Sequence, residues 1–93
     1  MSEESILVFE ERHMISIMLH ISENEGCTKT ELYDAVSNNQ RMPCKLDHLE
    51  ESGLIVQESI PDSRMVRLRL TGLGRQVCDA FVSIETIMSR RRE

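Results

Sequence analysis

The stretch from Thr28 to Gly74 constrains the fold more than any other part of this chain. It begins with Thr28-Lys29-Thr30-Glu31, which matches a capping box, where the threonine and glutamate side chains satisfy the first free N–H groups of a helix. A turn at Ser37-Asn38-Asn39 precedes a second helical pattern, which Gly53 stops. Strand-like segments on either side of Pro61-Asp62-Ser63 follow. Two short helices and then a hairpin predict an α+β domain.

The second of these helices is expected at about 39–52. Met42, Leu46 and Leu49 recur at helical spacing and are predicted to face the core. Pro43 is tolerated because it falls in the first turn, whose N–H groups have no partner within the helix. The positions left over are expected to face outward, and they are Asn39, Gln40, Arg41, Cys44, Lys45 and His48.

The hairpin is expected to be a basic wing at about 59–69. Val66, Leu68 and Leu70 alternate with Arg67 and Arg69, a pattern that predicts a half-buried strand with both arginines outward. Arg64 adds a third positive charge near the turn. A three-helix core with such a hairpin is a winged helix-turn-helix, an architecture that places one helix in the DNA major groove. We therefore expect double-stranded DNA as partner.

The flanking segments predict a homodimer. The first helix, from Met14, is apolar on more than one side, which indicates burial on more than one side. Residues 6–9 fit either the start of that helix or a separate extended arm. The last helix, capped by Thr71, repeats apolar residues at steps of four and three, as short coiled coils do. The expected interface residues are Ile15, Leu19, Val77, Phe81, Ile84 and Met88.

At 93 residues the chain is expected to be a single winged-helix domain. Residues 1–23 would form the N-terminal arm and helix, 28–70 the helix-turn-helix and wing, and 71–93 the C-terminal dimerisation helix. The formal charge of −5 is unusual for a DNA-binding protein. Residues 1–37 carry a net −6, however, whereas residues 38–93 carry +1. The acidic balance leaves open an alternative, a winged helix that binds another protein in a transcription or assembly complex.

Two short motifs resemble those of the MarR-like winged-helix regulators. The segment from Asp47 to Ile55 contains Leu-Glu-Glu-Ser-Gly-Leu-Ile, similar to the junction that ends the family's recognition helix. Leu70-Thr71-Gly72-Leu73-Gly74-Arg75 resembles the signature after the wing. The resemblance covers about residues 10–76, and a single helix after the wing is similar to the compact members that dimerise through it. It implies a dimeric transcription regulator whose groove-facing residues are the six outward positions given above.

Other chemistry has little support in the sequence. Cys44 and His48 are spaced like two metal ligands, but zinc needs three or four, so no metal or cofactor is expected. Cys44 could also sense oxidation, because Arg41 and Lys45 would lower its pKa if they lie close. No nucleophile–base series or phosphate loop indicates an enzyme. Three cysteines, an acidic start and the lack of a long apolar run predict a cytoplasmic protein with no membrane contact.

Overall fold

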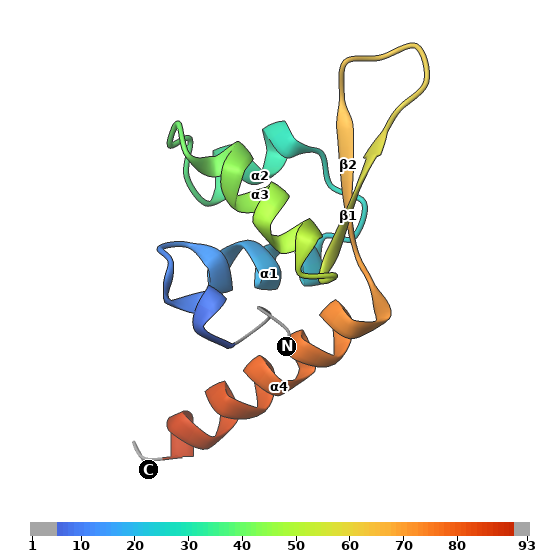
Figure 1. Ribbon diagram of the computed structural model, residues 1–93. Helices are drawn as coiled ribbons and strands as arrows, with labels where there is room; N and C mark the ends of the chain where they lie inside the picture. Colours follow the sequence, from blue (N-terminus) through green and yellow to red (C-terminus); the bar gives the residue numbers. More distant parts are fainter. Residues whose placement is uncertain (1–5, 91–93) are drawn as a thin grey trace.

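The computed structural model describes residues 6–90 and contains one short 3₁₀ helix, four α-helices and a two-stranded hairpin (Figure 1). In chain order the elements are η1 (Ile6–Glu10), α1 (Met14–Glu23), α2 (Lys29–Ala35), α3 (Met42–Glu51), β1 (Ile55–Ser59), β2 (Val66–Leu70) and α4 (Gly72–Ser89). This is a winged-helix fold, as the sequence predicts.

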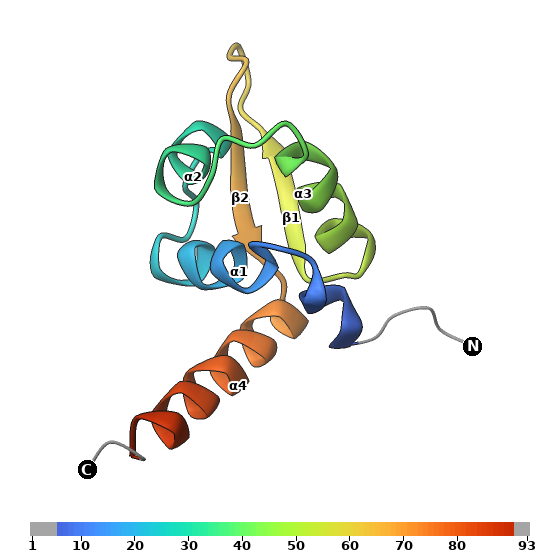
Figure 2. The same ribbon diagram turned by 90° about the vertical axis from the view of Figure 1, so that its left-hand side faces the viewer.

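The core lies where α1, α2 and α3 meet the base of the hairpin (Figures 1 and 2). Met14, Ile17, Met18 and Ile21 of α1 are fully buried and belong to the same core cluster as the apolar residues of α3. The expected inner residues of α3 are also fully buried, namely Met42, Leu46 and Leu49. Apolar side chains at helical spacing therefore position α3 against the body.

The helix ends follow the signals in the sequence. Glu31 N–H donates to Thr28 Oγ1 at 3.2 Å, and Thr28 N–H donates to Glu31 Oε1 at 2.9 Å, which completes the capping box. Gly53 has a φ of 82° after α3, and Leu54 N–H donates to the Leu49 carbonyl at 3.0 Å. This left-handed glycine with its backbone hydrogen bonds is the Schellman ending expected of a helix stop.

The hairpin pairs β1 with β2 antiparallel, with Ile55 opposite Leu70 and Ser59 opposite Val66. Leu68 and Leu70 are buried while Arg67 and Arg69 are exposed, so the predicted alternation is confirmed. The connecting loop contains a turn in which Ser63 N–H donates to the Ile60 carbonyl at 3.2 Å.

The N-terminal segment is neither the start of α1 nor an extended arm over residues 6–9. It forms η1, and residues Glu11 to His13 separate it from α1. His13 has a φ of 71°, which turns the chain sharply before α1 begins. Phe9 of η1 packs edge-on against Phe81 of α4, with ring centroids 4.9 Å apart. Residues 1–5 lie outside the described part of the chain.

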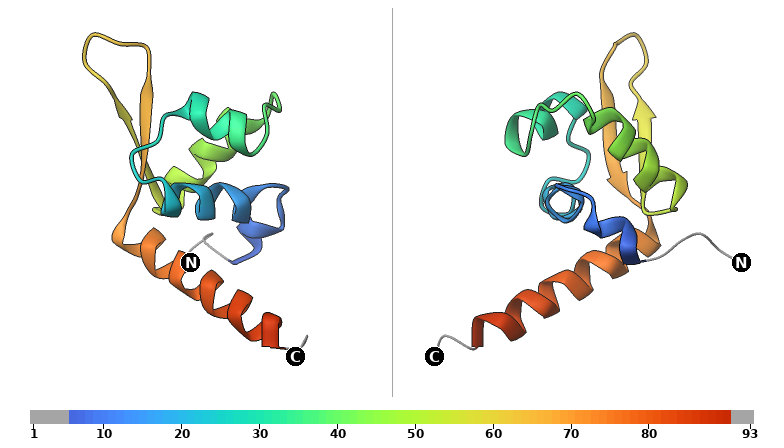
Figure 3. Two further views of the ribbon diagram at one scale, coloured as in Figure 1. Left: turned by 180° about the vertical axis from the view of Figure 1, so that it is seen from behind. Right: turned by 60° about the vertical axis from the view of Figure 1, so that its left-hand side comes forward.

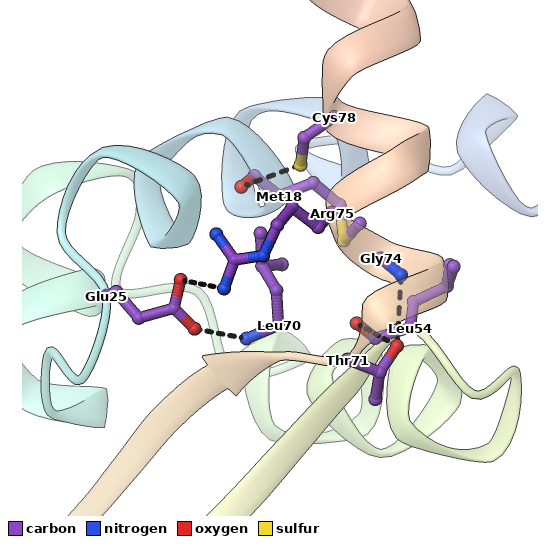
Figure 4. A network of polar contacts seen from close by, with 8 residues as sticks. All are labelled: Met18, Glu25, Leu54, Leu70, Thr71, Gly74, Arg75 and Cys78. Atoms are coloured by element: carbon purple, nitrogen blue, oxygen red, sulfur yellow. Dashed lines mark hydrogen bonds and ion pairs between the residues drawn. The ribbon is translucent and has the colours of Figure 1, made fainter.

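The start of α4 is fixed to the body by a polar network (Figure 4). Glu25, in the loop after α1, accepts from Leu70 N–H at 2.8 Å and from Arg75 Nη2 at 3.1 Å. Thr71 Oγ1 caps α4 by accepting from Gly74 N–H at 2.9 Å, as the sequence predicts. Beyond this junction α4 projects away from the body (Figures 2 and 3).

Candidate nucleic-acid interface

The N-terminal end of α3 and the loop of the hairpin lie at the same end of the molecule, and α4 leaves from the opposite end (Figure 2). Both segments are exposed along residues 38–41 and 61–65. A helix end and a wing tip on one side form a surface of the kind that winged-helix proteins can place on a duplex.

Three polar side chains are exposed at the start of α3: Asn39, Gln40 and Arg41. Asn39 Oδ1 accepts from Arg41 N–H at 2.7 Å and so fixes the backbone that leads into the helix. The side chain of Arg41, at the N-cap position, makes no capping hydrogen bond. Its guanidinium has no polar partner within residues 6–90, so it is available for the bidentate contact with guanine or phosphate that arginine geometry favours. Cys44 and His48 are exposed one and two turns further along.

The expectation that Lys45 faces outward is wrong. Lys45 is only 4% exposed, and its Nζ donates to Glu11 Oε2 at 3.2 Å. Lys45 lies three residues after Met42 and four before Leu49, so it falls on the same face of α3 as these two core residues. The buried face of the helix therefore includes Lys45 as well as Met42, Leu46 and Leu49. The long stem of a lysine can occupy such an apolar face when its charge has a partner.

Two of the three acidic residues of α3, Asp47 and Glu50, form hydrogen bonds with the hairpin. Gln57 of β1 donates from Nε2 to Asp47 Oδ1 at 2.9 Å and to Glu50 Oε1 at 3.0 Å. The backbone N–H of Gln57 also donates to Glu50 Oε2, at 3.2 Å. These bonds hold both carboxylates against β1 and join α3 to the wing. Glu51, by contrast, is exposed with no such bond within the described chain.

The three predicted wing arginines have different surroundings. Arg69 Nε forms an ion pair with Glu58 Oε1 at 3.0 Å, and Arg67 Nη1 donates to the Gly26 carbonyl at 3.2 Å. Both side chains, which belong to β2, are therefore already paired with other groups of this chain. Arg64 is exposed in the loop and has no polar partner within residues 6–90. It is the wing arginine with a free guanidinium.

An apolar groove of about 390 Å³ lies between η1, the end of α3 and α4. Among its lining residues are Phe9, Leu54, Leu73, Val77, Phe81 and Ile84. Of the predicted interface residues, Val77, Phe81 and Ile84 line this groove, and Met88 of α4 does not. Val77 and Phe81 are half-buried, while Ile84 and Met88 are 51% and 55% exposed. Ile15 and Leu19, on α1, do not line the groove; Ile15 is exposed and Leu19 half-buried.

The cysteines differ in their exposure. Cys44 is exposed, whereas Cys27 and Cys78 are buried and burial raises the pKa of both thiols. Cys78 Sγ donates to the Met18 carbonyl at 3.4 Å within the core. Within residues 6–90 no group of three histidine, cysteine or acidic side chains could hold a metal ion. No helix of this part of the chain is long and apolar enough to cross a membrane.

Two residues at this surface were not identified from the sequence. Gln57 is an ordinary polar residue of a strand pattern, and no neighbouring residue in the sequence indicates that it bonds to Asp47 and Glu50 of α3. Glu11 lies 34 residues before its partner Lys45, so no helical or strand spacing relates the two. Only the three-dimensional fold brings them together.

Comparison with known proteins supports the fold. The structure is similar to a solved structure described as reduced AbfR bound to DNA, with a TM-score of 0.61 and 22% sequence identity. The match covers 91% of this chain and 77% of that chain. No protein-family model matches the sequence, and no curated protein matches it significantly.

Proposed function

We propose that this protein is a homodimeric, MarR-like regulator of transcription that binds double-stranded DNA through the start of α3 and the loop of the wing. The observation that carries the proposal is the common placement of these two segments at the end opposite α4 (Figure 2). The direct contacts would come from Asn39, Gln40, Arg41, Cys44, His48 and Arg64. The solved DNA complex that shares the fold adds support.

The roles follow from side-chain chemistry and exposure. Arg41 and Gln40 have the donors and acceptors for bidentate contacts with guanine and adenine, respectively. Arg64, at the loop of the wing, suits phosphate or the minor groove. Arg67 and Arg69 would not contact DNA directly. Their bonds to Gly26 and Glu58 would instead stabilise the position and the strand pairing of the hairpin. Lys45 belongs to the helix but lies buried, so it is not assigned a direct contact in this state.

The proposed dimer uses one continuous apolar stripe on α4. The stripe begins at Leu73 and Val77 in the groove and continues through Ile84 to Ile87 and Met88, beyond the body of the domain. Ile87 is 60% exposed in the single chain. Soluble monomers rarely expose a long contiguous apolar surface, so we assign it to a second copy. Because η1 lines the groove at the start of this stripe, η1 would supply the N-terminal part of the proposed interface.

One observation favours the alternative, a protein-binding module. After its first turn, the exposed side of α3 carries Asp47, Glu50 and Glu51 and only His48 as a potential cation. Such a surface would repel phosphate and attract a basic partner. Gln57 holds two of these carboxylates against β1. DNA remains the better-supported partner because exposed Arg41 precedes the acidic part of the helix and lies at the same end of the molecule as the wing loop.

A polarisation titration on a labelled random-sequence duplex tests the proposal. Non-specific affinity at physiological salt is expected at Kd values of about 10⁻⁴–10⁻⁶ M, and it should fall steeply as salt rises. The Arg41→Ala/Arg64→Ala variant should bind more weakly with a shallower salt slope. Unchanged polarisation at 100 µM protein in low salt would refute DNA binding and favour the protein-binding alternative.

A further inference from the structure

Glu11 joins the N-terminal segment to the helix proposed to bind DNA. Its Oε2 accepts from Lys45 Nζ at 3.2 Å, and its Oε1 lies 3.7 Å from His48 Nδ1. One carboxylate thus faces both basic side chains that α3 contains between Met42 and Glu51. Arg41, just before the helix, has no such partner in the part of the chain that the structure describes.

The burial of the two partners is unequal. The Lys45 side chain is 5% exposed, whereas that of Glu11 is 40% exposed. The lysine therefore depends on Glu11 for charge compensation, because an unpaired ammonium is strongly disfavoured away from water. Without the carboxylate, the favourable course is for the flexible stem to extend and carry the charge to solvent. Lys45 is the fourth residue of α3, near the end of the helix that faces the wing loop.

The backbone next to Glu11 is held by contacts on both sides. Before it, Phe9 packs on Phe81 of α4 with a centroid separation of 4.9 Å. After it, Met14 N–H donates to the Glu11 carbonyl at 3.3 Å, and His13 adopts a φ of 71°. The carboxylate is consequently held against α3 by a short segment anchored on α4 and α1.

We infer that Glu11 is an autoinhibitory contact, which neutralises Lys45 and withholds its charge from DNA phosphate. The inference rests on the proposed function and deepens it. Loss of the contact would convert Lys45 from a buried, paired cation to a phosphate-binding one. The protein would then bind duplex DNA more tightly and with a stronger dependence on salt.

Glu11→Gln in the full chain tests the inference, with Glu10→Gln as matched control. The Glu10 side chain is exposed and makes no polar contact with the described residues, so its substitution changes the net charge equally without affecting the Lys45 contact. In duplex titrations over a salt series, Glu11→Gln should steepen the slope of log K against log salt by about one unit, the amount expected for one additional phosphate contact. Glu11→Gln/Lys45→Met should return the slope to the wild-type value.

A second measurement does not need DNA. Acetylation of Lys45 by an N-hydroxysuccinimide ester, followed by mass spectrometry with Lys29 as internal reference, should be several-fold faster in Glu11→Gln than in wild type or Glu10→Gln. Circular dichroism establishes that each variant is folded. Unchanged Lys45 reactivity in folded Glu11→Gln overturns the inference.

The two proposals fail in different ways. If wild type binds duplex but Glu11→Gln has the same salt slope, the autoinhibitory contact is refuted and the proposed function stands. If no variant binds duplex at any salt concentration, the proposed function itself is refuted, and the inference fails with it.

Discussion

Arg41 occupies the N-cap of α3, where its backbone is fixed by Asn39 and its side chain remains exposed. This combination holds the Cα in place and leaves the guanidinium free to bind. A base-edge contact of this kind contributes roughly 1–3 kcal/mol of discrimination. At the residue scale, Arg41 is the first candidate for sequence recognition.

Arg41→Ala should therefore weaken binding to a selected site by roughly 1–3 kcal/mol and relax the preference at one base position. Arg90→Ala, at the far end of α4, removes the same charge and should have little effect. Titrations against the site and against each single-base variant measure both quantities. An equal loss on every sequence would assign Arg41 to phosphate instead of a base.

The burial of two cysteines predicts the order in which the thiols react and how the stability of the protein depends on pH. Burial, and then the carboxylates of Glu31 and Asp79, raise the pKa of Cys27 and Cys78, respectively, so iodoacetamide should label exposed Cys44 first in the native protein. Because these folded-state pKa values are raised, the associated stability is complete below the ordinary thiol pKa of about 8.5 and is lost as pH rises above it. Mass spectrometry and denaturant titrations check the two effects. Equal labelling of all three thiols before unfolding would contradict the burial.

At the scale of elements, the backbones of α4 and the segment before β1 approach each other closely at Gly74. A Cβ added at Gly74 would overlap the Leu54 carbonyl oxygen, a backbone atom that cannot move aside independently. At Gly72, two residues earlier, a Cβ would meet nothing within 4 Å. The close approach explains why a glycine follows Leu73 in the motif at the start of α4.

Gly74→Ala should reduce the free energy of unfolding by about 1–3 kcal/mol, the usual cost of overpacking, and loosen α4 from Leu54, the residue before β1. Gly72→Ala is the matched control and should be neutral or stabilising, since alanine favours helix over glycine by about 1 kcal/mol. Urea titrations of both variants give the comparison. Equal effects of the two substitutions would show that the approach of α4 to Leu54 is not tight.

At the scale of the whole molecule, α4 extends beyond the body and carries its apolar stripe with it (Figure 3). Ile84→Glu places a charge in this stripe but outside the buried core, since Ile84 is 51% exposed. The variant should therefore remain folded and sediment as a monomer. Thr86→Glu, about opposite on the helix, adds the same charge and should stay dimeric. A wild-type monomer at micromolar concentration would refute the dimer.

Much of this molecule follows from local sequence patterns. The capping box at Thr28, the stop at Gly53 and the alternation before Thr71 are short-range signals, and each predicted its element. The sequence did not predict the burial of Lys45, its bond to Glu11 or the formation of η1. These features depend on contacts between segments far apart in the chain. The same limit applies to the groove beside α4, which is lined by η1 and could not be predicted from the sequence.

Selection of binding sites from a random duplex pool tests the central claim most directly. A dimer that binds through α3 and the wing should enrich an inverted repeat whose half-sites are centred about 10 base pairs, or one helical turn, apart. Arg41→Ala should lose preference at the same base in both halves. Failure of wild-type protein to enrich any duplex sequence, under salt conditions where it is folded, would contradict the account.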